Sequence, residues 1–384
     1  MIETIHVEAL KSIKDLRVNC SKFNLFVGTN SSGKSTFMQA LLLLAQKDLN
    51  GKYISLGEFR EVRNYYMSQN SIRIEMLGKN KKKPAWIDFI ENKEKDSYGI
   101  KTSLEDEVGI EELLGFNERI DPEQTDSLCD ESGFHYLSCH RVGARDIYAK
   151  NMLDENDFGI DGEYALAYLL KNESKVIPEE LVVKNEKITN SLLDQVNFWL
   201  NYIVGTTLII KDIKKTNYLQ VNYNNNPANI SSEALYCRPV NVGSGISYLI
   251  SIIISCLGSE YDSIIVIENP EIHLHPKAQS RLCEFLLFVS KTGRQFFVET
   301  HSDHFINRIV RRYMEDENIR DKIRIYFIDK DSDGLSSITP IRIDEVDGAI
   351  CDNENFFYQF ANETSRIIDI GYRNLQKRLN ETEN

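Results

Sequence analysis

The ten residues Ile267–Pro276, IENPEIHLHP, place two glutamates and two histidines close together in the chain. Glu268, Glu271, His273 and His275 are all residue types that bind metal ions, and H-x-H on a strand can hold zinc. The same carboxylates also suit phosphate chemistry, in which an acid at the end of a buried strand holds Mg²⁺. The rest of the sequence has to decide between a metal site and a phosphate site.

A glycine-rich stretch at 28–36, GTNSSGKST, matches the pattern G-x-x-x-x-G-K-[ST] between an apolar run and a helix-forming run. Glycine permits the tight turns that point backbone N–H groups at phosphate oxygens, and the following helix N-terminus favours negative charge. The lysine would contact the β and γ phosphates, and the serine after it would contact Mg²⁺. The predicted phosphate-binding residues are Gly28, Thr29, Asn30, Ser31, Ser32, Gly33, Lys34, Ser35 and Thr36.

Two strand ends can complete such a site. Glu268 directly follows the apolar run SIIVI, as expected for the carboxylate that holds Mg²⁺ together with Ser35. His301 follows a second apolar strand, FFVET, where a histidine can contact the γ-phosphate. The opening stretch therefore fits a nucleotide site better than a zinc site, in which His273 and His275 would be ligands.

A second small-residue loop, NVGSGIS at 241–247, opens a predicted helix, and its Gly243, Ser244 and Gly245 can also bind phosphate. This loop lies about 200 residues after the first one. Two such loops on one chain predict a head-to-tail homodimer, with each nucleotide held between the first loop of one subunit and the second loop of the other.

Hydrophobic periodicity predicts an α/β protein. Strands are expected at KFNLFVG, KYISLG, SIRIEML, FHYLSCHRV, SIIVIENP and RQFFVET, and IRIYFIDKDSDGLSSITPIRI reads as two strands around a turn. Helices are expected at 34–46, through much of 160–205, from 245, and from Pro276 to about Gly293.

The composition restricts the function classes. The formal net charge of −13 argues against a generally basic nucleic-acid surface, although a local DNA contact is left open. Seven scattered cysteines without a CxxC motif predict neither a disulfide framework nor a zinc ribbon, and fit the reducing cytoplasm. No apolar run is long enough to cross a bilayer, and no secretory signal is expected.

The order of these motifs resembles the ABC-type ATPases of the RecF/SMC-like class. Within them, the chain is similar to AAA-type ATPases related to the ATPase half of the overcoming-lysogenisation-defect nucleases. The opening HVEALKSIKDLRV fits that class, and DNENFFYQF (352–360) resembles the Phe-Phe-Asp-Gln-Phe ending of a subgroup. The resemblance implies an ABC-type ATPase head with a mixed sheet and flanking helices, a helical insertion and a small β-rich C-terminal extension. Its expected segments are 1–90 (ATPase lobe with the P-loop), 91–235 (largely helical insertion), 236–320 (ATPase lobe with signature loop, Walker B and switch histidine) and 321–384 (extension).

By this resemblance, the chain is a Mg²⁺-dependent ATPase that dimerises around ATP. It would act as sensor or motor subunit of a DNA-maintenance or anti-phage defence system, controlling an effector from a neighbouring gene. Glu268 takes the Walker B position, Gly243–Gly245 match the signature loop and His301 matches the switch histidine. One residue departs from the pattern: Asn269 occupies the position of the usual catalytic glutamate, and an amide accepts no proton. Either Glu271 replaces it or hydrolysis is slow.

Two alternatives remain at this point. A nuclease of the related type would need a Toprim-like acidic cluster, for which Asp329, Asp331 and Asp333 are candidates, although they are better explained as a hairpin turn. An ATP-binding scaffold with little turnover is the other, because of Asn269. The glutamine of the Q-loop is not placed securely, with Gln69 as a candidate.

Overall fold

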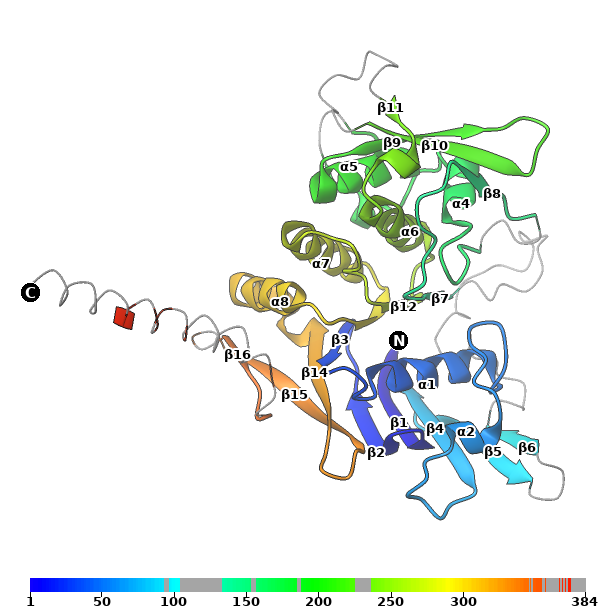
Figure 1. The fold of residues 1–384 in the computed structure, drawn as a ribbon, viewed down its shortest axis with the longest axis vertical. Coiled ribbons are helices and arrows are strands. Elements are labelled where there is room, and N and C mark those ends of the chain that lie inside the picture. The colour runs from blue at the N-terminus through cyan, green and yellow to red at the C-terminus, as the bar shows by residue number, and fades with distance from the viewer. Residues whose placement is uncertain are drawn as a thin grey trace, which may run out of the picture.

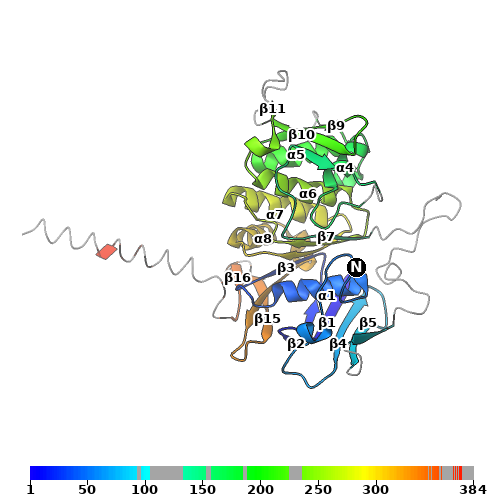
Figure 2. The ribbon, with the colours of Figure 1, turned by 45° about the vertical axis from the view of Figure 1, so that its right-hand side comes forward.

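The computed structural model describes residues 1–92, 97–103, 133–152, 157–184, 188–224 and 236–344, with 346, 348–353, 356, 366, 368, 370, 372 and 373. These residues form three sheets with helices packed between and around them (Figures 1 and 2). The predicted α/β class is confirmed.

A seven-stranded sheet in the order β16-β15-β14-β3-β13-β12-β7 forms the central layer. Neighbouring strands from β14 to β7 are parallel, whereas β15 and β16 join antiparallel at one edge. β3, β12 and β13 are buried along their whole length, which explains their continuous apolar sequences. The bounds are β3 Phe23–Gly28, β7 Phe134–Leu137, β12 Ile264–Glu268, β13 Gln295–Glu299, β14 Ile323–Lys330, β15 Ser336–Asp344 and β16 Gly348–Ile350.

Helices cover both faces of this sheet. Alternate residues of β3 point to opposite faces, so Phe23 and Leu25 join the core beneath α4 to α8, while Phe26 packs against Phe37 of α1. The helices are α1 Lys34–Gln46, α2 Phe59–Val62, α4 Ala165–Lys171, α5 Leu192–Val204, α6 Gly245–Gly258, α7 Pro276–Ser290 and α8 Asp303–Glu315, with 3₁₀ turns η1 Glu179–Leu181, η3 Pro239–Asn241 and η4 Glu317–Lys322.

Two further sheets flank the central one. A five-stranded antiparallel sheet, in the order β2-β1-β4-β5-β6, packs against the far side of α1 (Figure 1). A small sheet in which β10 pairs with β8, β9 and β11 lies beside α4 and α5. Their strands are β1 Ile2–Leu10, β2 Ile13–Asn19, β4 Ser71–Gly78, β5 Ala85–Asn92, β6 Ser97–Thr102, β8 Ile147–Ala149, β9 Thr207–Asp212, β10 Tyr218–Asn224 and β11 Tyr236–Cys237.

The strongly periodic segments fold as predicted. α1 occupies the predicted range, and α7 starts at Pro276, whose missing N–H costs nothing in the first turn. The predicted apolar stripe of α7 is buried and consists of Leu282, Phe285, Leu286 and Val289. The two predicted strands around the Ser-Asp-Gly turn are β14 and β15, paired antiparallel.

The strand expected at KYISLG (52–57) is wrong. Its β-type pairing is limited to one isolated bridge, from Ser55 to Asn50 just before the stretch. The Gln46 side chain accepts hydrogen bonds from the N–H groups of Tyr53 and Ile54 at 3.0 Å each. A side chain therefore satisfies backbone groups for which a strand would need a neighbouring strand.

The expectation of a largely helical insertion is also wrong for the described residues. Between 133 and 224 the strands β7 and β8 precede the helices α4 and α5 and the strands β9 and β10 follow them, and β7 joins the central sheet. Among the residues of 160–205 that the structure describes, two stretches form α-helix, since Pro178 and the turn after Asn172 interrupt the pattern. β14, assigned to a C-terminal extension, pairs with β3 inside the central sheet. Most of 352–360 lies outside the described residues.

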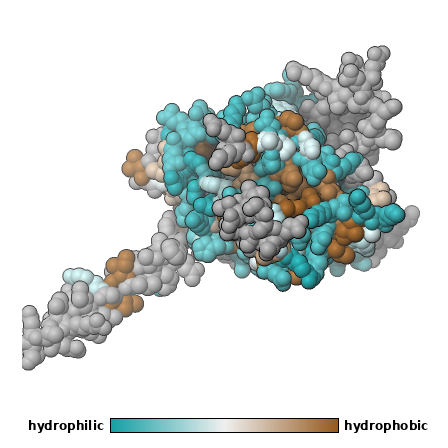
Figure 3. Space-filling model, turned by 90° about the horizontal axis from the view of Figure 1, so that it is seen from above, coloured by the Kyte–Doolittle hydropathy of each residue, from teal (hydrophilic) through white to brown (hydrophobic). Residues whose placement is uncertain are grey.

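Among the described residues, no helix combines the length and apolar character that spanning a bilayer requires. On the face seen from above in Figure 3, hydrophobic residues form patches bounded by hydrophilic ones.

Candidate functional site

The glycine-rich loop joins β3 to α1 in a shape that only glycine allows at two positions. Gly28 has a φ of 148°, and a Cβ there would lie 1.9 Å from the carbonyl oxygen of Ile328. Gly33 has a φ of 107° and caps α1, with Ser336 Oγ 2.0 Å from where its Cβ would be. The loop between them leaves Asn30 and Ser31 exposed to solvent. This cradle, at the carboxyl end of a central parallel strand, is the predicted P-loop.

Lys34 and Ser35 begin α1 and turn towards the loop and the sheet. Lys34 is 3% exposed, and its Nζ donates to the carbonyls of Gly28 at 3.1 Å and Thr29 at 2.6 Å. Ser35 Oγ donates to Glu299 Oε1 at 2.8 Å. Burial lowers the pKa of Lys34, while the nearby carboxylates, Glu299 first, raise it. The positive charge of Lys34 in this cradle is therefore partly balanced by nearby carboxylates.

Two glutamates stand side by side at the ends of β12 and β13, where Glu268 is opposite Glu299 in the parallel register. Burial, and then the charge of Glu268, raise the pKa of Glu299 to about 7. Burial also raises the pKa of Glu268, against hydrogen bonds from the Tyr136 side chain and the Cys139 backbone. The Glu299 Oε2 atom is buried and has no hydrogen-bond partner. Such a pair of carboxylates is suited to a cation.

The chain turns sharply directly after Glu268. Asn269 is left-handed with a φ of 44°, and its N–H donates to the Glu299 carbonyl at 2.8 Å. Asparagine tolerates this conformation better than most residues. The Asn269 side chain is an amide and cannot accept a proton. The structure therefore places no basic group at the position where the resemblance expects the catalytic glutamate.

Glu271 reaches from this turn to the end of β13. Its Oε1 accepts the backbone N–H of His301 at 2.8 Å, and its Oε2 is buried without a hydrogen-bond partner. It contributes to the electrostatic environment of Lys34. His301 is exposed, and burial of part of its ring and the Lys34 charge lower its pKa. The structure thus brings Glu268, Glu271 and His301 to the side of the sheet where the P-loop lies.

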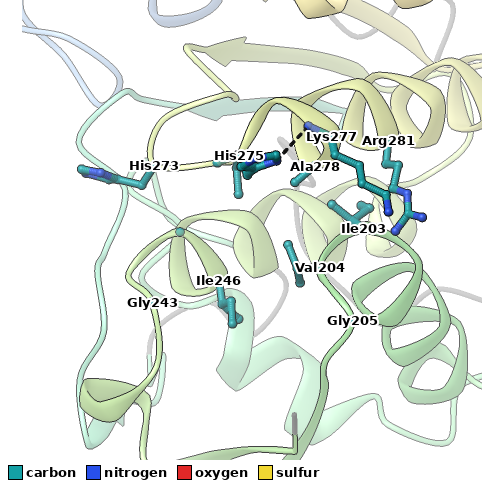
Figure 4. Close-up of a pocket in the computed structure, with 12 residues that line it drawn as sticks. Ile203, Val204, Gly205, Gly243, Ile246, His273, His275, Lys277, Ala278 and Arg281 are labelled. Carbon is teal, nitrogen blue, oxygen red and sulfur yellow. Dashed lines mark hydrogen bonds between the residues drawn. The ribbon is translucent and has the colours of Figure 1, made fainter. Parts of the chain in front are cut away.

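The second loop, Gly243–Gly245, lies at the N-terminus of α6. A Cβ on Gly245 would lie 2.4 Å from the carbonyl oxygen of His273, so this loop packs on the turn after β12. Beside it is a pocket of about 430 Å³ that also involves the end of α5 and the start of α7 (Figure 4). Figure 4 shows Gly243 and Ile246 on one side of this pocket and His275, Lys277 and Arg281 on another.

The two histidines of the opening stretch do not form a metal cluster with other groups in the described part of the chain. His275 Nδ1 accepts the Lys277 N–H at 3.3 Å and so caps α7 (Figure 4). His273 lies against the Tyr248 ring, with 5.1 Å between centroids. The ligand-type atoms that do come close together are those of His6, Glu8 and Asp15, on β1 and β2 of the five-stranded sheet.

The acidic residues after Phe327 separate into two groups. Asp331 accepts the N–H groups of Asp333 and Leu335 and so closes the β14–β15 turn, as expected for a hairpin. Asp329 differs from that expectation: it is 6% exposed and accepts the Thr29 hydroxyl at 2.8 Å. It therefore supports the P-loop and is not a turn residue. Gln69 is exposed in the loop before β4.

Three residues of the site were missed in the sequence. Glu299 had a signal, because it ends an apolar strand in the same way as Glu268 does. Tyr136 is the penultimate residue of β7, but an aromatic residue there fits a core equally well. Arg141 follows β7 in a loop, is 1% exposed and donates to the carbonyls of Glu268 and Asn269, for which the sequence offers no periodic pattern.

The residues present fit a nucleotide with Mg²⁺. The cradle of Gly28 and Gly33 has no room for side chains, Lys34 supplies a cation, and Ser35 a hydroxyl. The unpartnered oxygens of Glu271 and Glu299 are the oxygen type that Mg²⁺ prefers. A metal bound there would offset the mutual repulsion of the carboxylates.

The fold resembles solved heads of SMC proteins. The SMC head bound to the C-terminal winged-helix domain of ScpA aligns with a TM-score of 0.54 at 15% identity, covering 90% of this chain and 98% of that chain. An SMC head with an extended coiled coil, bound to the C-terminal domain of ScpA and derived from Pyrococcus furiosus, aligns with a TM-score of 0.50 at 14% identity, covering 88% and 96%. These likenesses show an SMC-type, and so ABC-type, ATPase head fold.

No curated protein matches the chain. The family model described as AAA ATPase domain matches residues 1–131 and 150–306, which include the P-loop, the second loop, Glu268 and His301. The chain therefore belongs to the AAA ATPase domain family.

Proposed function

We propose that the P-loop binds ATP with Mg²⁺ and that the site hydrolyses it. The observation that carries this proposal is the convergence of Lys34 and Ser35 with Glu268, Glu271 and Glu299 at the carboxyl ends of three neighbouring strands. Lys34 would bind the β and γ phosphates, and Ser35 and Glu268 would hold Mg²⁺. The metal supplies charge neutralisation at the phosphates when bound.

Glu271 is our candidate for the residue that orients and deprotonates the attacking water. Asn269 lacks a basic oxygen, whereas the Glu271 Oε2 atom is free of hydrogen-bond partners. The His301 N–H holds the other oxygen of Glu271 in place. His301 itself would contact the γ-phosphate from its exposed position at the end of β13.

We further propose a head-to-tail homodimer around ATP. Gly245 packs against His273 and Leu274 of the same subunit, whereas the space beside Gly243 is open, which leaves the N-terminus of α6 to bind the phosphate held by a second copy. His273 and His275 are exposed beside this loop and would lie at the interface. Dimerisation can be tested separately from hydrolysis, because Ser244→Arg should block dimerisation by bulk while leaving ATP binding to the P-loop intact.

The biological role proposed is that of a cytoplasmic sensor or motor subunit that controls a partner effector in DNA maintenance or anti-phage defence. It rests on the family resemblance and on the two solved SMC heads, each of which is bound to a domain of a partner protein. A higher assembly and a DNA contact are compatible with it. Co-purification of the product of the neighbouring gene with the tagged chain tests this part.

Phosphate release tests the activity. Purified protein should hydrolyse ATP only with Mg²⁺, and Lys34→Ala should abolish hydrolysis because the point charge at the phosphates is lost. An Asp321→Asn variant, altered at an exposed carboxylate, serves as control. Wild-type protein that binds no ATP would refute the proposal.

The second candidate is an ATP-binding scaffold with little turnover, which Asn269 favours. Tight Mg²⁺-dependent binding without phosphate release would support it. The nuclease alternative loses its best candidate in the described residues, because Asp329 is engaged with the P-loop and Asp331 with its own turn.

A further inference from the structure

We propose that Arg141 is a positioning residue for ATP hydrolysis, because it fixes the peptide units of Glu268 and Asn269 from which Glu271 extends. This inference rests on the proposed function. Arg141 lies in the loop after β7, the edge strand that pairs with β12. It touches neither the P-loop lysine nor Ser35 by hydrogen bond, and it acts through the backbone of the Walker B turn.

The hydrogen bonds of Arg141 go to main-chain carbonyls. Nη1 donates to Ser138 at 2.8 Å and to Glu268 at 2.7 Å, and Nη2 donates to Asn269 at 2.6 Å. Two nitrogens of one planar group thus hold two successive carbonyls. A guanidinium has this fork geometry, and a lysine ammonium, with all its donors on one nitrogen, does not.

The peptide unit held by Arg141 is also held from the other side. The N–H of Asn269 donates to the Glu299 carbonyl, and the left-handed φ of 44° at Asn269 redirects the chain. Two residues later, Glu271 accepts the His301 N–H. A rotation of the turn at Asn269 would therefore move the Glu271 carboxylate relative to the phosphates bound by the P-loop.

Burial of this arginine is costly, and the cost points to a role beyond packing. Arg141 is 1% exposed, burial lowers its pKa to about 10, and it stays protonated at neutral pH. Its Nε is buried without a hydrogen-bond partner. The charges that offset its burial are those of Glu271 and Glu268, which are residues of the site itself.

The same loop also touches the helix that begins with the signature loop. A Cβ on Gly143 would lie 3.4 Å from Tyr248 Oη on α6, and the Tyr248 ring lies against His273. Arg141 therefore stands between the Walker B turn and the element proposed to contact the second subunit. Its position suits a residue that fixes the Walker B turn relative to α6.

The chain offers a matched control in Arg294, the other fully buried arginine among the described residues. Its Nε donates to Ser259 Oγ and its Nη1 to Thr292 Oγ1, both at 2.8 Å, before β13 begins. Arg294 is thus as deeply buried as Arg141 and is also held by several hydrogen bonds, but it lies at the end of the sheet away from the P-loop. Arg141→Lys and Arg294→Lys each replace a buried guanidinium with an ammonium, the first beside the Walker B turn and the second at the opposite end of the sheet.

The experiment measures kcat, KM, the dissociation constant of a fluorescent ATP analogue and amide exchange of residues 268–275. Arg141→Lys should lower kcat about 10²-fold, the size of loss that follows a misplacement of about 1 Å, with nucleotide affinity unchanged. Exchange at 268–275 should become faster in this variant. Arg294→Lys should keep kcat and the slow exchange of 268–275 while losing thermal stability.

Unchanged kcat in Arg141→Lys, or an equal loss of kcat in Arg294→Lys, would overturn the inference. Absence of ATP hydrolysis in the wild type would instead refute the proposed function. Should Arg141→Lys not fold, Arg141→Gln replaces it, since its amide nitrogen keeps two N–H donors. The same loss of kcat at unchanged affinity is then expected, and unchanged kcat again overturns the inference.

Discussion

The two ends of the parallel strands in the central sheet differ in how well their buried polar side chains are hydrogen-bonded. At the amino ends, the Gln295 side chain accepts the Ile2 N–H at 2.7 Å and donates to the carbonyls of Ile2 and Ser21 at 2.8 Å each. Asn24 is bonded to Ser21 and Phe296 in the same way. These two amides connect the N-terminal strand to the central sheet, and the oxygen and nitrogen of each amide are hydrogen-bonded.

At the carboxyl ends, the groups are charged, crowded and incompletely bonded. Glu268 and Glu299 stand next to each other, and one oxygen each of Glu271 and Glu299 is buried without a partner. Gly28 and Asn269 hold left-handed backbone there. Unsatisfied carboxylates and backbone strain cost stability, and proteins retain them where they serve a ligand. The polar groups at the amino ends stabilise the fold, and those at the carboxyl ends are placed for the proposed nucleotide.

The largest expected effect is on activity at the carboxyl ends. Glu271→Gln should lower kcat by roughly 10²–10⁴-fold, the contribution of a general base, while ATP binding persists. Glutamine keeps an oxygen for the His301 N–H, so the turn should stay folded. Phosphate release and analogue binding measure the two quantities. Full activity in this variant would show that another residue is the base.

At the amino ends, the expected effect is on stability alone. Gln295→Ala removes the side-chain partner of the Ile2 N–H and carbonyl and one of the two hydrogen bonds to the Ser21 carbonyl, which Asn24 still holds, and should lower the free energy of unfolding by about 4 kcal/mol. Urea unfolding measures the loss, and kcat at a temperature where the variant stays folded should match the wild type. A large fall in kcat would break the division between the two ends.

Removing one carboxylate at the crowded end should stabilise the protein. The pKa of Glu299 lies at about 7 in the fold, against an ordinary value of 4.5. The folded chain therefore binds a proton that the unfolded chain releases, and stability falls as pH rises between these values, by about 3 kcal/mol. Glu299→Gln should flatten that fall relative to the wild type in urea unfolding across this pH range. An unchanged slope would show that Glu299 ionises normally.

The smallest effect is expected at Asn269. Asn269→Gly relieves the left-handed backbone and should stabilise the fold by about 1 kcal/mol or less. Because the amide is not a base, kcat should stay near that of the wild type. A strong loss of turnover would give the Asn269 side chain a catalytic role that the present assignment does not include.

The sequence predicts those parts of the molecule that local pattern determines. The P-loop has a fixed spacing, and α1 and α7 have uninterrupted apolar periodicity with suitable ends. The strand predicted at KYISLG does not form, because the Gln46 side chain, and not a neighbouring strand, accepts the hydrogen bonds of its backbone. Arg141 was not predicted because its partners are carbonyls 127 and 128 residues away, and sequence spacing carries no sign of such contacts.

Equilibrium binding of a fluorescent ATP analogue, with and without Mg²⁺, tests the central claim most directly, because both the hydrolysing and the scaffold form require it. We predict Mg²⁺-dependent binding to the wild type and to Gln295→Ala, and loss of binding in Lys34→Ala. Equal binding by Lys34→Ala, or no binding by the wild type, would contradict the assignment of the nucleotide site to the carboxyl ends of the sheet.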